Sequence, residues 1–134
     1  QIDGTPNIKN IISALKKGSC VISNGPLLTI TAENECLSAK IGGTIKGDNI
    51  VVKLNCLSNP EFGTINCVTL HCGEIGSSNE IELVREKPDD EVYTKLIQHN
   101  LHKINNPGYI RGILITTSPD GKLFHCYTNP IWID

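Results

Sequence analysis

The stretch GYIRGILITTSPDGKLFHCYTNPIWID, residues 108–134, decides how this chain folds. Tyr109–Thr117 is rich in β-branched side chains, which suit the pleated, half-buried surface of a strand. Ser118–Gly121 interrupts this run, because its proline presets φ and its glycine tolerates the left-handed conformation. A return strand follows over Leu123–Thr128. The stretch therefore predicts a β-hairpin closed by a type I turn with a glycine bulge.

A short strand is expected to end the chain. Asn129-Pro130 breaks the ladder, because proline has no N–H to donate, and Ile131–Ile133 follows with the only tryptophan, Trp132. An apolar run at a terminus is normally held in a sheet. We expect Trp132 to be buried against the N-terminal helix or the Ser23–Pro26 turn, so that it joins the two ends of the domain.

Composition indicates a single globular domain. The chain has 134 residues, 39% of them hydrophobic but only 4% aromatic, so isoleucine, leucine and valine must form most of the core. The net charge of −2 gives no footprint for nucleic acid, and no apolar run reaches the roughly 18 residues of a membrane span. We expect neither nucleic acid nor membrane as a partner, and the oligomeric state is open.

The chain contains no methionine, so we expect a piece of a longer protein. No pattern gives the compartment, and we favour the cytoplasm.

Residues 6–18 form the one good helix of the sequence. Four apolar residues follow the i, i+3, i+4, i+7 spacing of a single face: Ile8, Ile11, Ile12 and Leu15. Thr5 is the expected cap with Pro6 at the first helical position, and Gly18 is the expected terminator. This stripe must be buried, either on the β domain or on a domain that lies outside the chain.

Short strands and turns alternate through the rest of the chain. About seven to nine strands, with turn signals roughly every eight to twelve residues, are typical of an antiparallel β-sandwich of immunoglobulin-like architecture. Ile50–Leu57 is the clearest strand, because its apolar residues alternate. Ala39–Ile45 contains Gly42-Gly43 and is interpreted as one weak or bulged strand. Val92–Leu101 fits a strand or a two-turn helix, and we prefer the strand.

Motifs for catalysis are missing from the sequence. It contains no phosphate loop, HExxH pair, calcium loop or nucleophile elbow, and its four histidines are scattered. Most of the six cysteines lie in apolar, strand-like contexts, where a free thiol behaves as a small buried hydrophobe; disulfides or a metal site are the alternatives. The one grouping that suggests metal is Cys67, His71, Cys72, His125 and Cys126. Adjacent residues on a strand face opposite ways, so His71 with Cys72 cannot easily share an ion, nor can His125 with Cys126. We therefore assign no metal ligand, and without a catalytic motif we assign no catalytic residue.

Two Asn-containing turns stand out beside apolar strands, at residues 23–26 and 127–130. Ordinary turn chemistry explains them most simply, because Asn and Gly tolerate left-handed geometry and Pro ends a ladder. A role in binding stays open. The candidate interface or binding residues are Asn24, Gly25, Pro26, Thr128, Asn129 and Trp132.

The order of these motifs resembles the C-terminal domain of PHP-type (polymerase and histidinol phosphatase) metal-dependent phosphoesterases. The matching segments are ISALKKGSCVISNGPLLTI, IGGTIKG, IELVRE, YIRGIL and CYTNPIWID, which together span nearly the whole chain. The resemblance rests on a helix ending at Gly18, a strand leading into Asn24-Gly25-Pro26, and the terminal Thr128–Trp132. Ser19 departs from the pattern, since the family often has arginine there. Glu86–Asn106 carries no family signature.

This resemblance implies a division of labour within a longer hydrolase. In such enzymes the metal-binding His and Asp residues belong to an α/β barrel on the N-terminal side. Residues 1–18 would then be the last helix of that barrel, and residues 19–134 a non-catalytic accessory β-sandwich that supports the barrel or substrate access. The implied partner is the N-terminal catalytic barrel of the same chain, and the divalent metal is expected there and not in this fragment. The alternatives are an independent binding or adhesion module, for carbohydrate or protein, and a small metalloprotein that uses the Cys and His group.

We expect the isolated chain to hydrolyse no generic phosphoester, because it contains no ligand cluster of the kind that activates water. The measurement is release of p-nitrophenol from p-nitrophenyl phosphate with Mn, Zn or Fe supplied. Turnover that depends on added metal and stops with a chelator would contradict this expectation.

Overall fold

The computed structural model describes residues 5–102 and 106–134. Within these ranges the chain forms one helix and eleven strands. Their bounds are α1 (Ile8–Lys16), β1 (Val21–Ser23), β2 (Leu27–Glu33), β3 (Ser38–Lys40), β4 (Thr44–Ile45), β5 (Ile50–Leu57), β6 (Thr64–Glu74), β7 (Glu80–Glu86), β8 (Thr94–Leu101), β9 (Gly108–Thr117), β10 (Leu123–Thr128) and β11 (Ile131–Ile133).

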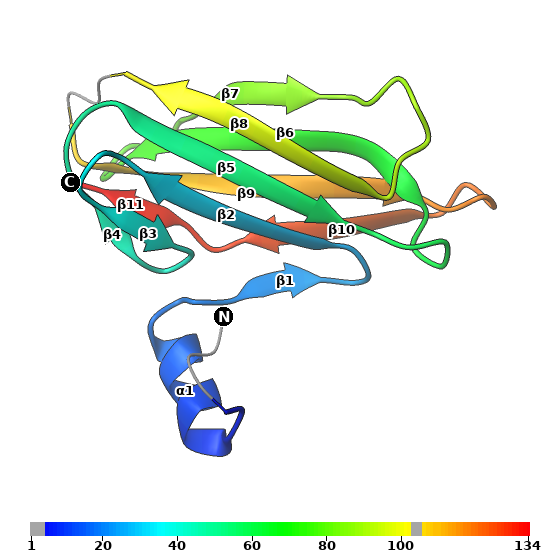
Figure 1. Cartoon of the computed structure of the whole chain (residues 1–134), viewed down its shortest axis with the longest axis horizontal. Coiled ribbons are helices and arrows are strands. Elements are labelled where there is room, and N and C mark those ends of the chain that lie inside the picture. Colours follow the sequence, from blue (N-terminus) through cyan, green and yellow to red (C-terminus); the bar gives the residue numbers. More distant parts are fainter. Residues whose placement is uncertain (1–4, 103–105) are drawn as a thin grey trace.

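The strands form two sheets that pack face to face (Figure 1). In the seven-stranded sheet, β9 pairs with β6 on one edge and with β10 and β11 on the other, while β7, β1 and β4 lie further out. The four-stranded sheet has the order β3-β2-β5-β8. The predicted antiparallel β-sandwich is thus confirmed, with one exception, since β4 and β11 pair in parallel. The immunoglobulin-like type stays a prediction.

The core between the sheets has the predicted composition. Its fully buried side chains are mainly isoleucine, leucine and valine, and Ile50–Leu57 alternates as expected. The preferred strand within Val92–Leu101 is confirmed as β8. All six cysteines are unpaired; Cys56, Cys67 and Cys126 are buried, whereas Cys36 is exposed. Desolvation raises the pKa of the buried Cys56 thiol to about 12, so this thiol stays protonated at neutral pH.

Strand β9 and its hairpin form as the sequence predicts. Alternate residues of β9 from Gly108 onwards are buried, and those between them are half-buried. The turn closes with two hydrogen bonds, in which the N–H of Ser118 donates to the carbonyl of Lys122 and the N–H of Gly121 donates to that of Ser118. Gly121 has a φ of 81°, the left-handed conformation that its position requires.

One edge of β9 serves two strands because the ladder breaks at Pro130. Strand β10 pairs with residues 113–117, and β11 pairs with residues 108–110. Between them, the N–H of Gly112 donates to Thr128 Oγ1 at 2.9 Å. The threonine side chain therefore replaces a main-chain acceptor where the proline interrupts the edge.

The Ala39–Ile45 segment is not the single bulged strand that the sequence analysis expects. It forms β3, which pairs with β2, and β4, which pairs with β11 in the other sheet. The chain crosses between the sheets at Gly42-Gly43, where Gly42 has a φ of 82°. Two consecutive glycines allow this reversal, and sheet membership then depends on pairing partners that lie far away in the sequence.

Helix α1 differs from its prediction in two respects. Its cap is Asn7 and not Thr5, because the Asn7 side chain accepts a hydrogen bond from the N–H of Asn10 at 2.9 Å. Gly18 ends it with a φ of 71°, as predicted. No residue of α1 is buried, and the helix lies outside the sandwich, on the side of β1 (Figure 1). The apolar stripe is therefore not buried on the β domain.

The predicted burial of Trp132 against the helix or the Ser23–Pro26 turn is wrong. Trp132 is 41% exposed and packs edge-to-face on Tyr109, with ring centroids 5.9 Å apart. Ile131 and Ile133 are the residues of β11 that enter the core. Side chains alternate along a strand, so placing both isoleucines inside puts Trp132 on the outer face.

We expect Ile131→Ala to lower the free energy of unfolding by about 2–5 kcal/mol, because it leaves a cavity in the core. Trp132→Ala should cost only about 1 kcal/mol, since its ring loses one aromatic contact on a solvated face. Urea unfolding of both variants provides the measurement. Equal losses, or a larger loss for Trp132→Ala, would contradict this arrangement of β11.

Candidate functional site

The joint between α1 and the sandwich is fixed by close backbone contacts. Asn129 Nδ2 donates to the carbonyl of Gly18 at 3.1 Å, and the Asn129 N–H donates to the carbonyl of Cys20 at 3.2 Å. Gly42 touches the same segment so closely that an added Cβ would lie 2.4 Å from the carbonyl oxygen of Lys17. The helix is thus joined to the sheets by a packed joint and not by a flexible linker.

This joint holds an exposed apolar stripe in one orientation. The stripe residues are exposed to very different degrees, but each is largely open to solvent: Ile8 78%, Ile11 43%, Ile12 47% and Leu15 59%. An amphipathic helix normally buries such a face. Within the described ranges no helix has the length and apolar character needed to cross a membrane. The stripe is therefore a candidate docking surface.

The Asn24-Gly25-Pro26 turn has a structural place beside β10. The N–H of Asn24 donates to the carbonyl of His125, and Asn24 Oδ1 accepts from the N–H of His125 at 2.7 Å. Gly25 lies under the ring of Phe62, which an added Cβ would meet at 2.5 Å. Pro26 is buried. The turn extends the β1–β10 ladder and leads the chain into the other sheet.

The other candidate residues lie at the opposite end of that ladder or beyond it. Thr128 is buried opposite Val21, and Asn129 forms the joint. Trp132 lies apart, on the outer face of the seven-stranded sheet beside Tyr109. The structure therefore does not bring the sequence-predicted residues together into one site.

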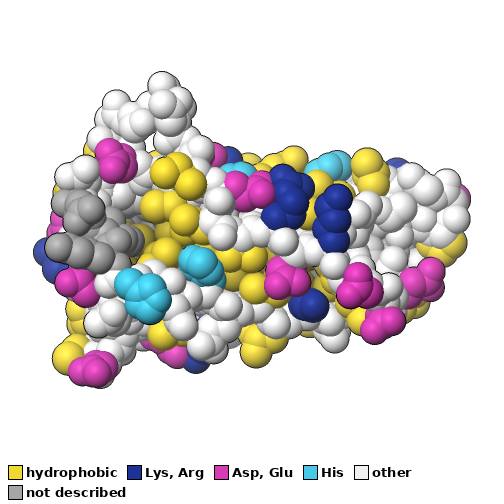
Figure 2. Space-filling view, turned by 90° about the horizontal axis from the view of Figure 1, so that it is seen from above, with side chains coloured by type: hydrophobic (Ala, Val, Ile, Leu, Met, Phe, Trp, Pro, Cys, Tyr) yellow, Lys and Arg dark blue, Asp and Glu magenta, His cyan; other side chains and the backbone are white. Residues whose placement is uncertain are grey.

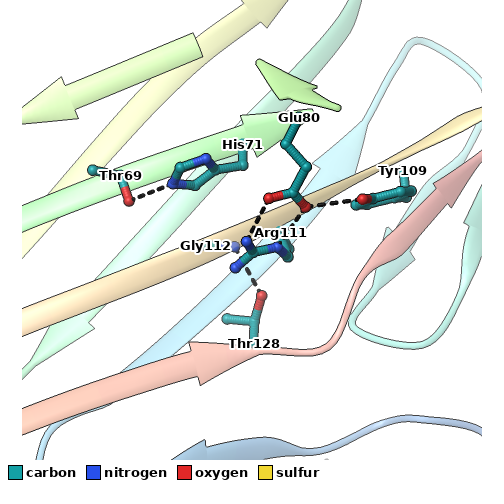
Figure 3. A network of polar contacts seen from close by, with 7 residues as sticks. All are labelled: Thr69, His71, Glu80, Tyr109, Arg111, Gly112 and Thr128. Carbon is teal, nitrogen blue, oxygen red and sulfur yellow. Dashed lines mark hydrogen bonds and ion pairs between the residues drawn. The ribbon is translucent and has the colours of Figure 1, made fainter. Parts of the chain in front are cut away.

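A polar network covers the half of the outer face that lies over β6 and β7 (Figure 3). Glu80 Oε1 accepts from the Tyr109 hydroxyl at 2.9 Å and from Arg111 Nε at 2.7 Å, and Oε2 pairs with Arg111 Nη2. The Tyr109 ring lies over Gly73, where an added Cβ would meet it at 2.6 Å. Glycine at this position thus lets Glu80 reach across β6 to β9.

Electrostatics follow directly from this geometry. The hydrogen bond from Arg111 holds the pKa of Glu80 below its usual value, and the hydrogen bond to Glu80 raises the pKa of the Tyr109 hydroxyl. Neighbouring polar groups are satisfied too: His71 Nε2 lies 2.9 Å from Thr69 Oγ1, and Arg85 pairs with Glu82. The sequence gives no signal for this network, because its members are 29 and 31 residues apart and only strand register joins them.

The other half of the same face, over β1 and β10, is apolar. Ile22 lies opposite Tyr127, which in turn lies opposite Ile113. Ile22 is 71% exposed, Tyr127 41% and Leu123 49%. His125 stacks on Tyr127 with ring centroids 6.1 Å apart, whereas its neighbour Cys126 is buried in the core. The side chains of His125 and Cys126 therefore face opposite ways, as the sequence predicts for adjacent strand residues.

A cleft opens between the sheets along the edges of β7 and β8 (Figure 2). It has a volume of about 420 Å³, and hydrophobic side chains gather in it, among them Ile81, Leu83 and Leu101. Burial raises the pKa of the Cys72 thiol in its wall, which keeps the thiol neutral and a poor nucleophile. In residues 5–102 and 106–134 no three His, Cys, Asp or Glu side chains come together in a way that could hold a metal ion.

Comparison with known proteins shows the fold alone. No protein-family model matches the chain, and no curated protein matches it significantly. A solved structure that resembles it is that of the PmoD soluble domain from Methylocystis sp. ATCC 49242 (Rockwell), with a TM-score of 0.53 and 13% sequence identity. The likeness covers 85% of this chain and 96% of that domain. It neither supports nor opposes the resemblance to PHP-type phosphoesterases.

We expect Glu80→Gln to lower the free energy of unfolding by about 1 kcal/mol at pH 7, because the partly buried pair with Arg111 is lost. The lowered pKa of Glu80 means that the native pair stabilises fully above the ordinary value of 4.5, and that its contribution disappears as pH falls through the lower folded value. The two proteins should therefore converge in stability in acid. Urea unfolding across that pH range, with Glu82→Gln as a more exposed control, measures the effect. A difference that does not change with pH would contradict the pairing.

Proposed function

We propose that this chain is a non-catalytic β-sandwich domain of a PHP-like metal-dependent phosphoesterase. It docks through α1 on the N-terminal catalytic barrel of the same protein, where it supports the barrel or shapes substrate access. The observation that carries the proposal is the exposed apolar stripe of α1 on a packed joint.

The short length of α1 supports a docking role. A helix of nine residues is shorter than the roughly 12–15 at which isolated helices become even marginally stable in water. Most helical stability in proteins comes from packing of the apolar face, and the sandwich leaves that face open. A packed joint with a fixed orientation is what a domain needs to meet a neighbouring surface in only one way.

The residues behind the family resemblance also meet at this joint. Gly18 ends the helix, Gly42 belongs to the IGGTIKG segment, and Asn129 belongs to the CYTNPIWID segment. These three residues are far apart in the sequence but contact one another or the same backbone. This supports the proposal, because a shared joint between barrel helix and sandwich would keep such residues together.

A binding module for carbohydrate or protein is the second candidate. Trp132 and Tyr109 favour it, because the exposed Trp132 ring packs on the half-buried Tyr109 ring beside the Arg111–Glu80 ion pair. Aromatic and arginine side chains are the groups that dominate recognition surfaces. Binding that survives changes in α1 and is lost with Trp132→Ala would favour this candidate.

Hydrogen exchange of the α1 amides tests the docking role. In the chain alone, amides of residues 11–17 should exchange at nearly unprotected rates, while those of β9 stay protected. In the full natural protein that contains this chain, the same α1 amides should exchange about a hundredfold more slowly, because packing stabilises the helix. Leu15→Lys should remove this protection, whereas Ser13→Lys, on the polar face, should leave it in place.

Two outcomes would overturn the proposal. One is an α1 that stays unprotected in the full natural protein. The other is a full natural protein that shows no chelator-sensitive phosphoester hydrolysis, which would remove the enzyme from the proposal and leave only a docking domain.

A further inference from the structure

At one border of the sandwich, an apolar side chain of the inner face is open to solvent. Ile81 of β7 pairs with Cys72, which pairs with the fully buried Ile110. Directly opposite residues of antiparallel strands project from the same face of a sheet, so Ile81 points toward the facing sheet. It is nevertheless 68% exposed. The core is therefore incompletely closed at this border, where β7 ends one sheet and β8 ends the other.

An ion pair confines the opening to one end of the border. Lys95 Nζ of β8 lies 3.7 Å from Glu86 Oε2 of β7 and so joins the two edge strands. The cleft of about 420 Å³ lies toward the other end, where it is lined by Leu101 of β8 and by Ile81 and Leu83 of β7. The hollow in Figure 2 is thus a short pocket and not a groove along the whole border.

This pocket has the size and lining of a small-molecule site. Such sites are concave and mainly apolar, enclose about 300–1,000 Å³, and contain a few polar groups that orient the ligand. A water-sized atom occupies about 30 Å³, so 420 Å³ gives room for roughly fourteen non-hydrogen atoms. A larger hollow beside β3, of about 510 Å³, fits this description less well, because polar residues of the 33–38 turn form most of its lining.

A polypeptide strand fits this border less well than a small molecule. A β-bulge shifts the pairing of β6 and β7 between Leu70 and His71. Lys95 pairs with the buried Cys56 and therefore points inward from β8. Bulges and inward-pointing charges are features that keep an edge strand from pairing with another chain. The occupant that fits is short and needs no main-chain pairing.

The polar groups of the pocket lie at its exposed rim, beside the turn between β6 and β7. Asn106 Nδ2 donates to Glu74 Oε1 at 3.1 Å, and the Asn79 N–H donates to Ser77 Oγ at 3.1 Å. All four residues line the pocket and are exposed. Side-chain amides can bind a hydroxyl or an amide of a ligand, whereas a ligand carboxylate would lie near the charge of Glu74. The rim therefore favours an uncharged polar end.

We propose that the cleft between β7 and β8 binds a small uncharged molecule that is aliphatic over most of its length and carries one hydroxyl or amide end. The aliphatic part lies between Leu101 of one sheet and Ile81 and Leu83 of the other. The polar end lies at the rim, beside the side-chain amides of Asn79 and Asn106. This site is independent of the proposed function, because it uses neither α1 nor a neighbouring domain.

Methyl NMR of the chain during titration with octanol tests the site, because it reports on individual side chains. We expect saturable shifts of the methyl groups of Ile81, Leu83 and Leu101. Leu96 is the control and should not shift, because it is also 68% exposed but lies on the outer face of the four-stranded sheet. Octanoate should bind about tenfold more weakly than octanol, because its charge would lose water beside Glu74.

A matched pair of variants assigns the binding to this cleft. Ile81→Asp places a charge in the apolar wall and should weaken octanol binding by about tenfold or more. Leu96→Asp, at an equally exposed position on the other sheet, should leave the affinity unchanged. Both side chains are largely open to solvent, so neither variant should change the melting temperature by more than a few degrees. This second measurement controls for loss of folding.

Three results would overturn the inference. Shifts that never saturate, or that are as large at Leu96 as at Ile81, mean that octanol coats the surface without a site. Saturable binding that Ile81→Asp leaves unchanged places the site elsewhere. Octanoate that binds as tightly as octanol overturns the uncharged class of ligand.

Discussion

The two-sided pairing of β9 is the constraint on which the rest of the structure depends. Its ten residues pair along their whole length with β6, and the opposite edge is shared by β10 and β11. A strand hydrogen-bonded on both edges and buried on one face has a fixed register, because a slip of one residue would turn its apolar side chains to solvent. The positions of Arg111, Tyr109 and Ile113 on the outer face follow from that register.

The break at Pro130 connects this central ladder to the helix. Proline cannot donate to the ladder, so pairing along this edge of β9 stops after β10 and begins again with β11. Between the two strands, Thr128 Oγ1 accepts the hydrogen bond from the N–H of Gly112. The carbonyl of Pro130 accepts from the N–H of Gly42, and the side chain of Asn129 holds Gly18. One interruption in one strand thus anchors α1 and the crossing between the sheets. This is why the orientation of the exposed stripe is a property of the whole sandwich.

Charge pairing decides how the two halves of the outer face meet their surroundings. Both carboxylate oxygens of Glu80 accept hydrogen bonds, from Arg111 and Tyr109. These charged and polar groups over β6 and β7 therefore have partners within the chain. The half over β1 and β10 offers mainly aliphatic and aromatic surface, with the His125 ring stacked on Tyr127. Neighbouring strands of one sheet thus present a surface of paired charges beside a surface of exposed apolar side chains.

The sequence by itself determined the features that depend on local chemistry. Period-two alternation located Ile50–Leu57, and β-branched composition located β9. The Ser118–Gly121 turn located β10, the hairpin partner of β9, and Gly18 marked the end of the helix. The sequence did not identify the helix cap, which is Asn7 and not the predicted Thr5. Only the tertiary structure decided the rest: the outward position of Trp132, the split of Ala39–Ile45 between two sheets, and the Glu80–Arg111 pair. Each of these depends on which distant strand is the neighbour and in which register, and local residue preferences carry no information about that choice.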